Sequence, residues 1–147
     1  MNALRFTSLI AADRKKVWDV MLADDTYRKW TAEFQEGSYF EGSWEKGARI
    51  RFLGPGGGGG MTAVIAENRP YEYVSIKHLG IVKDGVDDTE SAEAKAWAPA
   101  FENYTFTQSG NATSLTIDVE VPAEFQAYMS EAWPKALAKL KELCEAK

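Results

Sequence analysis

The last stretch of the chain, Pro122 to Lys147, constrains the fold more than any other part of the sequence. Its apolar residues recur at the spacing of a helix with one apolar face: Phe125, Met129, Ala132, Trp133, Ala136, Leu137, Leu140, Leu143 and Cys144. Pro122 suits a helix start, because the N–H group that proline lacks would be unpaired there. Such a helix must pack against another layer, and strand-like sequence precedes it. We therefore expect a sheet that packs against a C-terminal helix.

Length, charge and cysteine content limit the class of protein. The 147 residues, 45% of them hydrophobic, fit a single domain over 1–147 whose core needs no disulfide or structural metal. A formal net charge of −5 argues against nucleic-acid or anionic-membrane binding, which require concentrated Lys and Arg. Cys144 is the only cysteine, which suits a reducing compartment. With no apolar run near about 20 residues and no signal-peptide order of charges, we expect a soluble cytoplasmic monomer or homodimer.

Two short helices are predicted between a first strand at residues 4–10 and the rest of the sheet. Asp13 is a suitable N-cap for the first helix, which carries Val17, Trp18, Met21 and Leu22 at helical spacing. The second helix has possible caps at residues 24–26 and carries Tyr27, Trp30 and Phe34. We expect Trp18, like Leu140 of the last helix, to be buried in the core.

Beyond Gly37 the pattern changes to short strands separated by turn signals. The alternation predicts strands at residues 38–40, 48–53, 61–67, 71–81, 101–108 and 113–121. Residues 83–99 read as an acidic, irregular loop. The glycine-rich residues 54–60 lack the lysine and the following helix of a phosphate-binding loop, so we expect a flexible hairpin loop or a flap over a cavity mouth.

This order of elements is that of an α+β helix-grip fold, a curved antiparallel sheet around a long C-terminal helix. Several motifs in it resemble the START-like (SRPBCC) superfamily of birch-pollen-allergen-like proteins and polyketide cyclases. Within that superfamily they are most similar to domains of the activator of heat-shock-protein-90 ATPase. The motifs are Val17-Trp18, Tyr27 with Trp30, residues 42–47 (GSWEKG), residues 70–76 (PYEYVSI), and Trp133-Pro134 with Leu137, Leu140 and Lys141. The superfamily includes carriers, enzymes and co-chaperones, so the resemblance indicates fold more than function.

Strand alternation places His78 on one face with Val74 and Ile76, and places Glu102 on one face with Tyr104 and Phe106. If these faces turn toward the last helix, they form either a ligand cavity or a filled core, and the resemblance favours the cavity. The predicted ligand-binding residues are Trp30, Phe40, His78, Glu102, Tyr104, Phe106, Phe125, Met129 and Trp133.

We predict no catalytic residue, metal or cofactor. His78 is the only histidine, and acid–base catalysis would require a partner, for which Glu102 is the inward candidate. The spacing of Asp84, Asp87 and Asp88 does not fit a calcium loop, and no zinc ligand set or nucleophile motif is present.

The favoured function is binding of a small hydrophobic or amphipathic molecule, such as a lipid, polyketide or aromatic metabolite. The alternatives are a co-chaperone-like module that binds a chaperone, as the resemblance implies, and a cyclase- or lyase-type enzyme that uses the same cavity.

Overall fold

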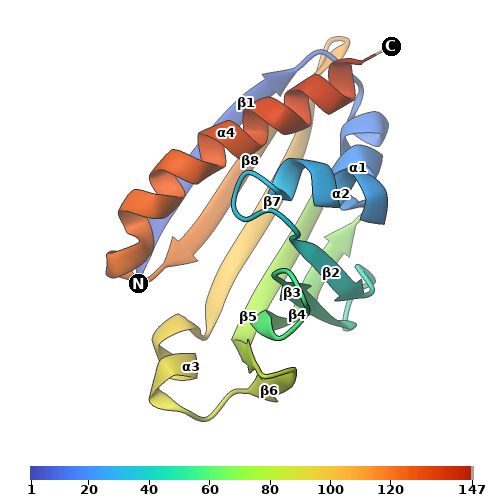
Figure 1. Ribbon diagram of the computed structural model, residues 1–147. Helices are drawn as coiled ribbons and strands as arrows, with labels where there is room; N and C mark the ends of the chain where they lie inside the picture. The colour runs from blue at the N-terminus through green and yellow to red at the C-terminus, as the bar shows by residue number, and fades with distance from the viewer. Residues whose placement is uncertain (147) are drawn as a thin grey trace.

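The computed structural model describes residues 1–146, which form one eight-stranded antiparallel sheet partly covered by helices (Figure 1). The elements follow the chain as β1 (Asn2–Ile10), α1 (Arg14–Leu22), α2 (Asp24–Thr31), β2 (Tyr39–Gly42), β3 (Arg49–Leu53), β4 (Gly59–Arg69), β5 (Tyr73–Lys83), β6 (Val86–Asp88), α3 (Ala92–Trp97), β7 (Ala100–Ser109), β8 (Ala112–Val121), a 3₁₀ turn (Ala123–Phe125) and α4 (Gln126–Glu145). The sheet order is β1-β8-β7-β5-β4-β3-β2, with β6 paired to β5. This architecture confirms the predicted α+β helix-grip fold.

Helix α4 packs its apolar side onto the sheet and onto α1 and α2. Trp133, Ala136, Leu137 and Leu140 are buried, as their spacing predicted. In Figure 1 the helix crosses the sheet beside β1, and the N-terminus of the chain lies near its first turn. The regular helix begins at Gln126 rather than Pro122, because Ala123–Phe125 form a 3₁₀ turn first. Lys147, the last residue of the predicted helix, lies outside the described residues.

Two bulges bend the central strands β4 and β5. Thr62 pairs with Gly80 while Ala63 pairs with His78, so Leu79 is an extra residue in β5. A second shift in register makes Ala66 an extra residue in β4. Bulges bend a strand and increase its local twist, and bulges are frequent beside functional sites. The first of these two lies next to His78, the only histidine of the chain.

The prediction that residues 83–99 are irregular is wrong, because they contain β6 and α3. Helix α3 begins after Ser91, whose hydroxyl oxygen accepts a hydrogen bond of 3.1 Å from the Ala94 N–H. Strand β6 is held by Asp87, which pairs with Arg51 at 2.8 Å. The acidic side chains of this segment therefore hold it against the sheet instead of being only solvated.

The two short helices α1 and α2 begin differently. Asp13 caps α1 as expected and accepts from the Lys16 N–H at 2.9 Å. Helix α2 has no side-chain cap, because Ala23 occupies the N-cap position. Asp24 and Asp25 lie in its first turn, where acidic groups interact favourably with the helix dipole.

Of the two residues predicted to be buried in the core, Leu140 is fully buried, whereas Trp18 is only half-buried. Across residues 1–146, every helix is too short or too polar to cross a membrane.

Candidate functional site

A cavity of about 270 Å³ lies between the sheet, α2 and α4 and is partly open to solvent. Strands β3, β4, β5, β7 and β8, the loop after α2 and the end of α3 complete its walls. Most of the lining side chains are apolar or aromatic. The lining residues are Tyr27, Trp30, Thr31, Phe34, Gln35, Ser38, Phe52, Leu53, Gly54, Gly60, Met61, His78, Trp97, Ala100, Glu102, Tyr104, Val119, Glu120, Val121, Tyr128, Met129 and Trp133.

A polar cluster of His78, Glu102 and Tyr104 stands in this apolar wall. His78 on β5 is opposite Ala100 on β7, and Glu102 is two residues further along β7. Diagonal neighbours on one face of a sheet are within reach of long side chains. His78 Nε2 therefore approaches Glu102 Oε1 at 3.1 Å, and the Tyr104 hydroxyl donates to Glu102 Oε2. The partner that the sequence predicted for His78 lies beside it.

The phenol groups of the cavity keep their protons at neutral pH. Burial raises the pKa of Tyr27 well above its ordinary value, and the nearby charge of Glu102 raises it further. Burial also raises the pKa of Tyr104, with added contributions from Glu102 and Tyr27. The Tyr104 hydroxyl therefore donates to the Glu102 carboxylate, and Tyr27 stays protonated near the same charge.

The surroundings of His78 determine which of its nitrogens carries the proton. Its Nδ1 atom is buried and has no hydrogen-bond partner in residues 1–146. The Glu102 carboxylate can only accept a hydrogen bond, so the contact requires a proton on His78 Nε2. The Phe52 ring packs against the imidazole with centroids 5.8 Å apart. His78 therefore donates to Glu102 from a position fixed by its neighbours.

Aromatic rings adjoin the polar cluster in the cavity wall. Trp133 on α4 contacts Trp30, Phe34 and Tyr104, with ring centroids between 4.9 and 6.2 Å apart. Trp30 Nε1 donates to the Met21 carbonyl oxygen at 3.0 Å, so the only polar group of its side chain is paired away from the cavity. The indole rings can thus present apolar surface to a ligand.

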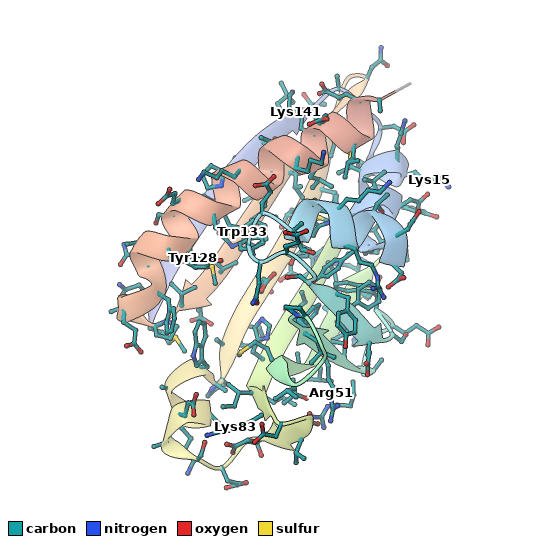
Figure 2. All side chains as sticks on the ribbon, in the orientation of Figure 1. Lys15, Arg51, Lys83, Tyr128, Trp133 and Lys141 are labelled. Carbon is teal, nitrogen blue, oxygen red and sulfur yellow. The ribbon has the colours of Figure 1, made fainter. Side chains whose placement is uncertain are left out.

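The mouth of the cavity is bordered by the start of α4, the loop after α2 and α3. Tyr128 and Trp133 follow one another along α4 (Figure 2), and the half-exposed Tyr128 donates its hydroxyl proton to the Phe34 carbonyl oxygen. Trp97 of α3 packs on Phe125, with ring centroids 4.5 Å apart. Contacts between segments far apart in the sequence therefore limit access to the cavity.

The glycine-rich segment that joins β3 to β4 also borders the cavity, through Gly54 of the loop and Gly60 at the start of β4. Gly60 has a φ of +151°, and a Cβ atom there would lie 1.9 Å from the Phe52 carbonyl oxygen. Only glycine fits at this point of the wall. The segment joins β3 and β4 as the predicted hairpin loop, and its role as a flap stays a prediction.

The structure places six of the nine predicted ligand-binding residues in the lining: Trp30, His78, Glu102, Tyr104, Met129 and Trp133. Phe40 instead packs against Tyr27 and Trp44, with centroids 5.0 and 5.3 Å apart. Phe106 is covered by Trp18 of α1 at 5.1 Å. Phe125 precedes α4 and faces Trp97. Whether the six residues contact a ligand stays a prediction.

Several lining residues were missed by the sequence analysis. Tyr27 and Phe34 are three and four residues from Trp30, so helical spacing placed them on the same side and was the available signal. Phe52 alternates with Arg51 in a predicted strand. Trp97 and Tyr128 had no such signal, because Trp97 follows a segment predicted to be irregular and Tyr128 lies off the main apolar side of the helix. Among residues 1–146 there is no group of three or more potential metal ligands.

The sequence matches no protein-family model and no curated protein. Solved structures with the same fold do match. One is protein CV1439 from Chromobacterium violaceum, 18% identical, with a TM-score of 0.72 and 99% of both chains covered. Another is the Aha1 dimer from Colwellia psychrerythraea, 19% identical, with a TM-score of 0.74 and 99% of this chain and 97% of that chain covered.

A third similar structure is CalU16 from Micromonospora echinospora, 13% identical, with a TM-score of 0.68 and 97% of this chain and 76% of that chain covered. At these identities the likeness concerns the fold. The chain therefore shares the helix-grip fold of these structures.

Proposed function

We propose that the protein binds one small hydrophobic or amphipathic molecule in the cavity between the sheet, α2 and α4. The observation that carries this proposal is the combination of an aromatic wall with the converging polar groups of His78, Glu102 and Tyr104. Ligand sites typically have this composition and volumes of about 300–1,000 Å³. The cavity, at about 270 Å³, suits a compact ligand such as an aromatic metabolite, a small polyketide or a short lipid chain.

A titration with the neutral naphthalene dye prodan tests the proposal. We expect saturable 1:1 binding with a blue shift of the dye. Ala100→Phe fills the floor of the cavity, where Ala100 is buried, and should weaken binding at least tenfold. Ala138→Phe makes the same change on an exposed position of α4 outside the cavity and should leave binding unchanged. A folded Ala100→Phe variant that binds prodan like the wild type would contradict the proposal.

Native mass spectrometry of protein purified from its own cells provides a second test. A retained small molecule in 1:1 ratio supports the carrier function, and the same spectrum reports whether the protein is a monomer or a homodimer. We place the protein in the cytoplasm, because its single cysteine, Cys144, is buried and suits a reducing compartment.

A second candidate function, a co-chaperone-like module, is favoured by the likeness to the Aha1 dimer. It predicts that the purified protein changes the ATPase rate of a heat-shock-protein-90 chaperone, and that the change persists in Ala100→Phe. If Ala100→Phe no longer changes the ATPase rate, the effect depends on the cavity and not on a separate binding surface.

A further inference from the structure

The charged groups of the cavity wall are all acidic. Glu102 and Glu120 line it, and neither Lys nor Arg does so in the part of the chain that the structure describes. The Glu102 side chain is 23% exposed. Glu120 is half-buried and accepts a hydrogen bond of 2.8 Å from the Phe101 N–H. A ligand in the cavity therefore meets two carboxylates and, within residues 1–146, no Lys or Arg in the wall.

Glu102 stands at the centre of the polar cluster. Its carboxylate accepts from His78 Nε2–H and from the Tyr104 hydroxyl. A carboxylate with two oxygens offers about four acceptor sites, so capacity remains for a donor from a ligand.

We propose that the cavity selects its ligand by charge and takes a hydrophobic amine in its ammonium form. The ammonium group would lie near Glu102, where low dielectric strengthens its attraction to the carboxylate. Ring faces attract cations within about 6 Å of their centroids, and the rings of Tyr27, Trp30, Tyr104 and Trp133 line the same cavity. The apolar body of the ligand would fill the space toward Met129 and Val119.

The same arrangement excludes anions. A carboxylate ligand, such as a fatty acid, would be desolvated beside Glu102 with no Lys or Arg in the described part of the wall to pair with it, and burying an unpaired charge is unfavourable. A neutral alcohol would be accepted without the electrostatic gain. This inference rests on the proposed function of the cavity and adds the chemical class of the ligand.

A head-group series with one apolar body tests the inference by isothermal titration calorimetry at pH 7. The probes are 2-(2-naphthyl)ethylamine, 2-(2-naphthyl)ethanol and 2-naphthylacetate. We expect the amine to bind at least tenfold more tightly than the alcohol, and the carboxylate to bind at least tenfold more weakly than the alcohol. In the Glu102→Gln variant the affinity for the amine should fall to within threefold of the affinity for the alcohol. Glu131→Gln changes the net charge equally at an exposed position of α4 and should keep the wild-type ratios.

The outcomes separate the inference from the proposed function. If neither prodan nor any naphthyl probe binds, the proposed function fails. If the alcohol binds as tightly as the amine, if the carboxylate binds most tightly, or if prodan binds and the amine does not, the charge selection is wrong and the carrier function stands. The wild-type series decides this point even if Glu102→Gln does not fold, which circular dichroism would reveal.

Discussion

At the scale of single residues, the contact of His78 with Glu102 joins β5 to β7 inside the cavity. Alternation in two strands gave the inward faces of His78 and Glu102, and so their possible contact. The contact itself depends on the β5–β7 register, in which His78 is opposite Ala100. Alternation does not determine register, and the extra residue Leu79 in β5 leaves no signal in the pattern. The hydrogen bond from Tyr104 and the orphaned Nδ1 required the structure.

Replacing His78 with Gln tests whether this side chain only positions a ligand. The Gln amide can donate to Glu102 in place of Nε2–H, so the fold should be retained. We expect prodan affinity to fall by about threefold to tenfold, the range of one hydrogen bond. Prodan titration measures the affinity, and thermal unfolding shows whether the fold is retained. Should a substrate be found whose turnover His78→Gln abolishes while folding and binding survive, an enzyme function would replace the carrier function.

Cys144 gives the stability of the protein a specific pH dependence. Burial raises the pKa of its thiol from 9.0 to about 12. Because the unfolded chain ionises first, the stabilising contribution is complete below pH 9 and is lost as the pH rises toward 12. At pH 10.5 the loss from this group should be roughly 2 kcal/mol. Urea titrations at pH 8 and 10.5 should show a larger loss of unfolding free energy in the wild type than in Cys144→Ala. Equal losses in the two proteins would contradict this prediction.

At the scale of elements, prediction succeeded where a periodic pattern was long. Helix α4 and strands β7 and β8 were predicted closely, because ten or more residues repeat one period. Helix α3 and strand β6 were missed because each is six residues or shorter. Their stability comes from tertiary contacts, such as the ion pair of Asp87 with Arg51, which periodicity does not reveal.

The docking of α4 is tested by Leu140→Ala. Leu140 is completely buried, so its truncation should lower the free energy of unfolding by roughly 2–5 kcal/mol. Glu142→Ala on the exposed side of the same helix should change it by less than about 0.5 kcal/mol. Urea titration of the two variants compares them directly. A Leu140→Ala loss as small as that of the control would show that α4 is not packed as described.

At the scale of the whole molecule, the sequence predicted one inward face of the sheet but not which helix covers each part of that face. Helices α1 and α2 cover parts of the same sheet face that α4 covers elsewhere. Phe106 therefore lies under Trp18, and Phe40 lies against Tyr27, while Tyr104 and His78 line the cavity. Strand alternation gives the side of the sheet on which a residue lies, but not which helix covers it. That division depends on helix placement, which only the tertiary structure provides.

Methyl chemical-shift mapping by NMR during a titration with prodan tests whether a small molecule occupies the cavity between the sheet, α2 and α4. We expect the largest shifts at lining methyl groups, those of Met61, Met129, Val119 and Val121, with little change at the exposed Leu9 and Val86. Largest shifts at Leu9 or Val86, with the four lining methyl groups unchanged at saturation, would contradict it.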